Sequence, residues 1–147
     1  MGRGPWPPSK RRERFRWLVA KRLETLLEAV QKPACVAVIR DPGGRISDEL
    51  GWQEATAAAK TLGTALKPID ITTGDELESG FAEIARNGCR ALLVMSSSVY
   101  IGVRQQLVDL ASRYRLPAIY DNRLFVADGG MMSYGPDTND MYRHAAS

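Results

Sequence analysis

Polar side chains follow several apolar, strand-like runs of this chain, at places where a parallel sheet would carry a ligand site. A serine run, Ser96-Ser97-Ser98, follows one such run and precedes an amphipathic segment. Hydroxyls and free backbone N–H groups at a helix start favour a carboxylate or another anion. The other candidates are acids, amides, phenols and guanidinium groups in equivalent places. The ligand-binding set predicted in this way is Asp41, Ser96, Ser97, Ser98, Asn122, Arg123, Tyr134 and Asp137.

Each of these candidates also has a purely structural interpretation. The serine run can serve as a helix N-cap with two polar neighbours. The stretch Asp41-Pro42-Gly43-Gly44 can be a turn before the next helix, and Asp137 can cap a last helix. The residues alone leave both interpretations open at each position.

Catalytic signatures are not found in the sequence. The chain has one histidine, His144, and no C-x-x-C, phosphate-binding or dinucleotide-binding glycine motif. A response-regulator receiver needs an aspartate after the third strand, where this chain has Met95-Ser96. We therefore predict a protein that is not an enzyme, with no catalytic residues, no cofactor and no metal site.

The two cysteines, Cys35 and Cys89, each begin an apolar run. We interpret them as two small buried hydrophobic residues. A disulfide bond requires that the two runs be neighbours with suitable Cβ geometry.

The elements that would position the candidates alternate along the chain. Strand-like apolar runs cover 34–39, 66–71, 91–95, 117–120 and 131–134, and amphipathic helical patterns lie between them. Strands that are apolar on both faces indicate a parallel sheet covered by helices on both sides. The predicted fold is α/β: a single flavodoxin-like, three-layer lobe with about five parallel strands in the order 2-1-3-4-5. In such sheets ligands bind outside the carboxyl ends of the strands, near the switch in strand order.

Charge is distributed unevenly along the chain. The first 22 residues hold eight Lys or Arg and one Glu, whereas the remainder holds 12 Lys or Arg and 16 Asp or Glu. We expect residues 1–20 to form a basic, disordered leader and residues 21–147 to form the lobe. The apolar stretch at 17–20 is too short for a secretory signal, so the chain as written is expected to be cytoplasmic.

The ordered set of segments resembles solute-binding proteins of ABC transporters, of the type I periplasmic-binding family. "KRLETLLEAV", "VAVIRDP" and "FAEIARNGCRALLVMSSS" are similar to successive parts of the second lobe of that family. "GGMMSYGPDTNDMYRHAA", which includes Tyr134 and Asp137, is the most specific match, and in the family it leads into a helix. The resemblance implies that the candidate set forms one wall of a solute cleft and that the family works outside the cytoplasm.

Because the resemblance covers one lobe, we expect weak binding of a small organic solute, such as an amino acid or carboxylate, or none at all. Losing half of a micromolar binding energy of about −8 kcal/mol leaves millimolar affinity. An ABC permease is an expected partner only if a full receptor is reconstituted.

Two other functions compete with solute binding. A lobe that exposes a face its partner once covered could pair with itself, so we expect a homodimer. The basic stretch Lys10–Arg22, with Phe15 and Trp17, could bind nucleic acid or an anionic membrane, although nucleic acid is not the partner that we favour.

Overall fold

The computed structural model describes residues 11–31, 33, 35–42, 46–134 and 141–143 of the 147-residue chain. The described strands form one sheet in the order β2-β1-β3-β4-β5-β6. The strands are β1 (Cys35–Arg40), β2 (Ala65–Asp70), β3 (Ala91–Val94), β4 (Ala118–Tyr120), β5 (Met132–Tyr134) and β6 (Met141–Arg143). The helices are α1 (Arg11–Ala29), α2 (Ile46–Leu62), α3 (Leu77–Asn87), α4 (Ser98–Gly102), α5 (Arg104–Arg113) and α6 (Arg123–Ala127), with a 3₁₀ turn, η1 (Gly74–Glu76).

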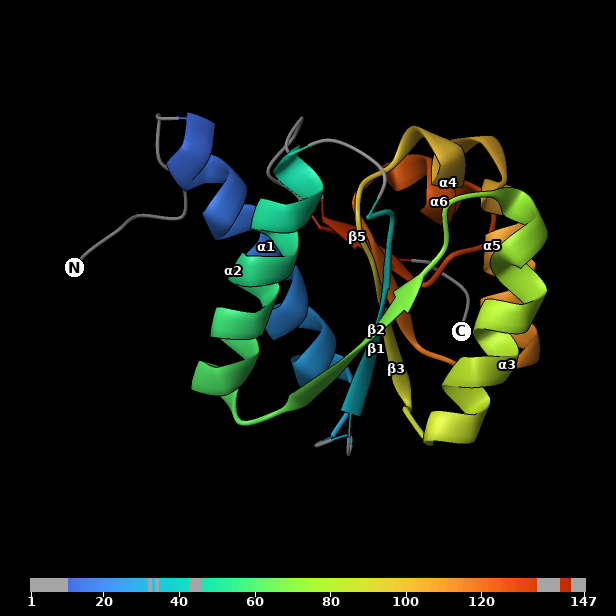
Figure 1. Ribbon diagram of the computed structural model, residues 1–147, viewed down its shortest axis with the longest axis horizontal. Helices are drawn as coiled ribbons and strands as arrows, with labels where there is room; N and C mark the ends of the chain where they lie inside the picture. The colour runs from blue at the N-terminus through green and yellow to red at the C-terminus, as the bar shows by residue number, and fades with distance from the viewer. Residues whose placement is uncertain (1–10, 32, 34, 43–45, 135–140, 144–147) are drawn as a thin grey trace.

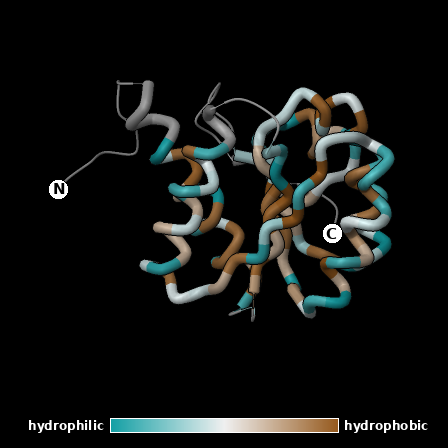
Figure 2. Tube along the Cα trace, viewed as in Figure 1, coloured by the Kyte–Doolittle hydropathy of each residue, from teal (hydrophilic) through white to brown (hydrophobic). Residues whose placement is uncertain are grey.

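Helices cover both faces of the sheet (Figure 1). Alternate residues of β1 point to opposite faces: Ala37 and Ile39 pack with α3 and α5, and Val36 and Val38 pack with α1 and α2. Figure 2 shows the central strands as the most hydrophobic part of the trace. Burial on both faces explains why β1 and β3 consist almost entirely of apolar residues.

The predicted flavodoxin-like order is confirmed, because β1 to β5 are parallel and follow the order 2-1-3-4-5. The sixth strand, β6, pairs antiparallel with β5 and was not expected. Residues 141–143 therefore extend the sheet, at a place where the family resemblance suggested the approach to a last helix.

The first helix begins at Arg11 and runs without a break to Ala29. Leu18 and Val19, which the sequence analysis assigned to the leader, are buried among residues of the sheet and α2. Residues 1–10 lie outside the described residues. The part of the expected leader that the structure describes is thus helical. No helix in the described ranges is both long enough and apolar enough to cross a membrane.

The interpretation of Cys35 and Cys89 as independent buried residues is wrong, because they form a disulfide bond with a Cα–Cα distance of 4.8 Å. Cys35 opens β1 and Cys89 lies just before β3, and these two strands are adjacent in the sheet. The backbone N–H of Arg90 also donates to the Cys35 carbonyl at 3.3 Å. Strand pairing, which spacing alone does not reveal, brings the two thiols together.

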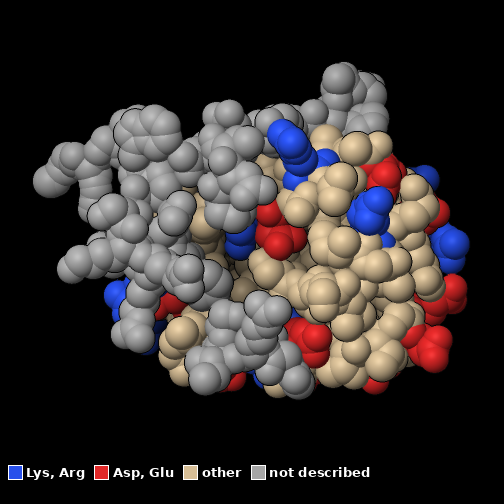
Figure 3. Space-filling view, turned by 90° about the horizontal axis from the view of Figure 1, so that it is seen from above, with Lys and Arg blue, Asp and Glu red and all other residues tan. Residues whose placement is uncertain are grey.

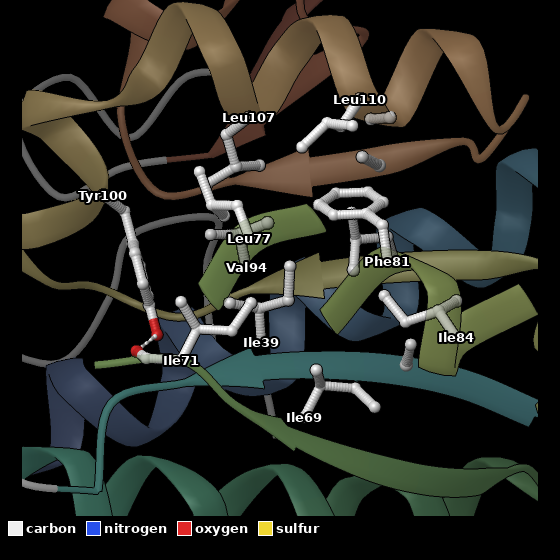
Figure 4. Packing of buried hydrophobic residues seen from close by; sticks show 14 of the residues in the cluster. Ile39, Ile69, Ile71, Leu77, Phe81, Ile84, Val94, Tyr100, Leu107 and Leu110 are labelled. Carbon is white, nitrogen blue, oxygen red and sulfur yellow. Dashed lines mark hydrogen bonds between the residues drawn. The ribbon is translucent and has the colours of Figure 1, made fainter. Parts of the chain in front are cut away.

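The third helix begins and ends as its sequence predicts. The backbone N–H of Thr73 donates to the Glu76 carboxylate at 3.2 Å in a capping box at the start of η1, the turn that leads directly into α3, and Gly88 ends α3 with φ of 75°. Phe81 and Ile84 of this helix pack on the sheet (Figure 4). Beside them the Tyr100 hydroxyl of α4 donates to the Ile71 carbonyl at 2.7 Å, which fixes α4 over the end of β2.

Candidate functional site

The carboxyl ends of the five parallel strands point to the same edge of the sheet, at the top of Figure 1. The strand order reverses between β1 and β3, and this switch point is where open α/β sheets bind ligands. Asp41 directly follows β1, and Ser96, Ser97 and Ser98 follow β3 and Met95. Figure 3 looks down on this edge, where acidic and basic side chains lie close together beside the atoms drawn in grey.

A hydrogen bond joins the two loops at the switch point. The Ser97 hydroxyl donates to Oδ2 of Asp41 at 3.0 Å, across 56 positions of sequence. The same Ser97 oxygen accepts from the Val99 backbone N–H at 3.1 Å and so caps α4. Ser97 therefore has the structural role that the sequence left open, and in addition it contacts a second candidate.

The candidate residues around Ser97 differ from one another in exposure. Ser96 and Ser98 are exposed, whereas Asp41 is only 9% exposed. The Asp41 carboxylate stands at the start of α4, where the sequence analysis expected an anionic group of the solute. A helix of five residues has a small dipole, and this carboxylate already complements it.

The loop after β4 is organised around Asn122. Its side-chain oxygen accepts from the Leu124 backbone N–H at 2.8 Å, which caps α6. Asp121 and Asn122 are half-buried and Arg123 is exposed. This loop lies next to the Ser96–Ser98 loop because β4 pairs with β3.

Arg22 of α1 is a member of this region that sequence reasoning missed. Its side chain is 4% exposed, and its Nε donates to the Tyr134 carbonyl at the end of β5, at a distance of 2.6 Å. Burial lowers the pKa of Arg22, and the negative charge of Asp121 opposes that shift. Arg22 thus ties α1 to the end of β5 and carries a charge attracted by Asp121, just after β4.

A signal for Arg22 was present in the sequence. It lies four residues after Leu18 and four before Leu26, and both of these leucines are buried. A charged residue inside an apolar helical stripe is expected to have a specific partner. Its place at the end of the basic stretch Lys10–Arg22 concealed this position.

Tyr134 is 8% exposed and packs with the residues between the sheet and α1. Its ring lies against Trp17 with centroids 5.7 Å apart. The structure places Tyr134 at the correct edge of the sheet, with its ring on the α1 side. Asp137, the last candidate, lies outside the described residues.

The Gly129-Gly130 pair shapes the entry into β5. Gly129 has φ of 108°, which is unfavourable for other residues, and a Cβ on Gly130 would lie 2.7 Å from the Phe125 carbonyl and 2.9 Å from the ring of Tyr120. The chain can therefore pass close beneath α6 only with two glycines. This turn brings Met132 into pairing with Ile119.

Several grooves lined by described residues lie away from this edge. One of about 700 Å³ runs between α2 and β2 and includes Trp52, Thr56 and Leu66. Another, of about 590 Å³, lies near the disulfide and includes Arg90 and Arg115. In the described part of the chain, no group of three or more His, Cys, Asp or Glu could hold a metal ion.

Comparison with known proteins gives matches at the level of structure only. No family model matches the chain, and no curated protein matches it in sequence. An ABC domain from Streptococcus pneumonia in complex with L-Trp superimposes with a TM-score of 0.71 and 15% identity, over 84% of this chain and 42% of that one. A ligand-free, open substrate-binding protein with adhesive properties from Clostridium difficile superimposes with a TM-score of 0.70 and 18% identity, over 80% of this chain and 39% of that one.

A third similar structure is a periplasmic sugar-binding protein of an ABC sugar transporter from Legionella pneumophila. It gives a TM-score of 0.54 and 13% identity, over 86% of this chain and 55% of that one. The chain thus spans about two-fifths of the length of the first two proteins and about half of the third. Its fold is that of a single lobe of substrate-binding proteins.

Proposed function

We propose that this chain is a solute-binding lobe, related to the substrate-binding proteins of ABC transporters, that binds a small organic solute without transforming it. The observation that carries the proposal is the Ser97–Asp41 hydrogen bond at the switch point. It holds the loops after β1 and β3 together at the place where this fold class binds ligands. The neighbouring structures, which include one with L-Trp and one that is a sugar-binding protein, support the same role.

The site on this lobe is one wall of a cleft. Asp41, Ser96–Ser98 and Asn122–Arg123 supply polar groups from three strand ends, and Arg22 of α1 is hydrogen bonded to the end of β5. Ligands in pockets usually bury most of their surface, so a second wall must contribute to tight binding. One wall alone is expected to bind the solute with a millimolar Kd.

A thermal-shift screen tests this function. The chain is heated with amino acids, amines, small carboxylates and sugars, each at millimolar concentration. A ligand at 100 times its Kd raises the free energy of unfolding by about 2.7 kcal/mol, and proportionally less at lower saturation. The expected result is a reproducible rise in Tm with at least one class of solute. No shift with any class at about 10 mM would contradict the proposal.

The disulfide points to the compartment in which the lobe works. Disulfide bonds persist in oxidising compartments and are rare in the cytosol. The Cys35–Cys89 bond therefore supports an extracytoplasmic location, in agreement with the periplasmic neighbour and in contrast to the cytoplasmic expectation from the sequence. Alkylation of free thiols in protein taken directly from its native cells tests this: both cysteines should be protected, and two reactive thiols would contradict it.

The homodimer expected from the sequence stays a prediction, and the free edge of β2 is a poor route to it. The Ile71 N–H donates to the Arg40 carbonyl, so every second residue back from Ile71 faces β1. Pro68 alternates with these residues and occupies an outward position, where it cannot donate to an incoming strand. Light scattering at tens of micromolar tests the homodimer, and a strictly monomeric mass would contradict it.

A further inference from the structure

The Asp41 carboxylate is the most poorly compensated charge at the candidate site. The side chain is only 9% exposed. One oxygen, Oδ2, accepts a hydrogen bond from Ser97, and no other described residue is hydrogen bonded to the carboxylate. A carboxylate this deeply buried is costly unless it is paired with a positive charge.

The cation next to Asp41 in sequence is already engaged elsewhere. Arg40, the neighbour of Asp41 in the chain, turns toward the edge strand, where its Nε lies 2.8 Å from Oδ1 of Asp70. Its guanidinium also lies 5.1 Å from the ring centroid of Trp52. Among the described residues no ion pair includes Asp41.

The second cation of this region, Arg22, is also committed. Its Nε donates a hydrogen bond to the Tyr134 carbonyl, and the carboxylate that attracts its charge is that of Asp121. Because Arg22 is buried, with 4% of the residue exposed, its guanidinium cannot turn toward a solute without breaking this hydrogen bond. The wall therefore has a negative charge at the switch point, a buried and occupied positive charge beside β5, and the exposed guanidinium of Arg123 in the loop after β4.

The Asp41–Ser97 pair itself offers only hydrogen-bond acceptors, and the exposed hydroxyls of Ser96 and Ser98 lie in the same loop as Ser97. Ser97 has one hydroxyl proton, and that proton is given to Asp41. The second Asp41 oxygen and the remaining lone pair of Ser97 can each accept but not donate. Such a set is suited to a donor with positive charge and is repelled by a carboxylate.

We propose that Asp41 receives the ammonium group of the solute, so that the class of ligand taken by this wall is an amine-bearing small molecule. This inference rests on the proposed solute-binding function and specifies its chemistry. The ammonium donates to the free Asp41 oxygen and supplies the counter-charge that the described residues do not. An N⁺–H···O⁻ bond of about 2.8 Å is among the stronger contacts available to a protein.

Two indole probes of similar size test the inference. Tryptamine carries an ammonium group and no carboxylate, and indole-3-propionate carries a carboxylate and no amine. Each is titrated into the ¹⁵N-labelled full chain while amide resonances are followed. Tryptamine should bind at least tenfold more tightly, with the largest shifts at Asp41 and Ser97.

Two matched variants test whether tryptamine binding depends on the Asp41 carboxylate. Asp41→Asn, which removes the charge at nearly constant volume, should weaken tryptamine binding at least tenfold. Asp109→Asn makes the same change on the exposed face of α5 and should leave binding unchanged. Because the comparison of the two probes uses the unmodified protein, it decides the question even if Asp41→Asn does not fold.

The possible outcomes distinguish failure of the ammonium assignment from failure of the solute-binding function. If indole-3-propionate binds as well as or better than tryptamine, the ammonium assignment is wrong and the solute-binding function survives. If tryptamine binding is unaffected in a folded Asp41→Asn variant, the assignment to Asp41 is likewise overturned. If neither probe binds and the broader solute screen also shows nothing, both the inference and the proposed function fail.

Discussion

Arg22 brings a positive charge into the apolar layer between α1 and the sheet. The cost of burying the guanidinium is offset by its short bond to the Tyr134 carbonyl and by the attraction of Asp121. The three groups come from α1 and from the ends of β5 and β4. A single side chain thus joins the first helix to two loops of the candidate site.

Replacing Arg22 should therefore destabilise the fold far more than replacing other arginines of the same helix. Arg22→Met keeps much of the packing volume, removes the hydrogen bond to the Tyr134 carbonyl and removes the positive charge that Asp121 attracts. The expected loss in the free energy of unfolding is about 3 kcal/mol, measured by urea titration. Arg16→Met is the control. The Arg16 side chain, which pairs with Glu54, is 60% exposed, so this change should lower the free energy of unfolding by less than about 1 kcal/mol. Equal effects of the two changes would contradict the role given to Arg22.

Arg115 ends α5 in a conformation that suits glycine. Its φ is 56°, and the Arg115 and Leu116 N–H groups donate to the Ser112 and Ala111 carbonyls as in a glycine-terminated helix. Arg115→Gly should raise the free energy of unfolding by about 1 kcal/mol. The reciprocal change, Gly88→Ala at the end of α3, introduces a Cβ that meets nothing within 4 Å but is strained at φ of 75°, and should lower it by about the same amount. Thermal unfolding of both variants checks this, and a destabilised Arg115→Gly would refute it.

At the scale of elements, the capping box of α3 depends on the ionised form of Glu76. The backbone N–H of Thr72 is the main cause that lowers the pKa of Glu76 from its ordinary 4.5, with the Thr72 hydroxyl and the Thr73 N–H contributing further. A carboxyl group with a lowered pKa in the folded state stabilises the fold above its unfolded pKa. That stabilisation is lost as the pH falls below about 4.5 and through the folded value.

The difference in Tm between the wild-type chain and Glu76→Gln should consequently depend on pH. We expect the wild type to be the more stable at pH 7 and the difference to shrink steadily below pH 4.5. Glu78→Gln is the control, since Glu78 is exposed and makes no box. A difference that stays constant from pH 7 to pH 3 would contradict the box as the cause.

The elements show which parts of the fold a sequence can reveal. β1 and β3 were predictable because strands buried on both faces consist of continuous apolar residues, and α3 because its box and Gly88 mark its ends. β6 was missed because the family resemblance assigned residues 141–143 to the approach to a helix, whereas β4 and β5, equally short, stood out as buried apolar runs. The disulfide was missed because it depends on the pairing of β1 with β3, which is a property of topology and not of spacing.

The candidate site was predictable to a similar extent. Topology alone puts Asp41 and Ser97 at the switch point, and their hydrogen bond agrees with that placement. Arg22 and Trp17 were not found, because their contacts with Tyr134 join residues more than 100 positions apart. Local charge placed both residues in the basic stretch Lys10–Arg22, whereas packing of one face of α1 on the sheet decided their position.

At the scale of the whole molecule, the disulfide closes a loop of 54 residues that contains β1, α2, β2 and α3. Cross-linking a loop of this length restricts the unfolded chain and is worth roughly 2–4 kcal/mol. The Cys35→Ala, Cys89→Ala double variant should lose about that much, as should the wild-type chain in a reducing buffer. The reductant should have no effect on the double variant. Unchanged stability after reduction would contradict a structural role for the bond.

The central claim is that the carboxyl edge of the sheet binds a small solute. Its most direct test is a titration of the ¹⁵N-labelled chain with the solute that gives the largest rise in Tm in the thermal-shift screen, with every amide resonance followed to millimolar concentration. The account predicts saturable shifts concentrated at Asp41, Ser96–Ser98 and Asp121–Arg123. Shifts concentrated in the groove between α2 and β2, or none at saturating solute, would contradict it.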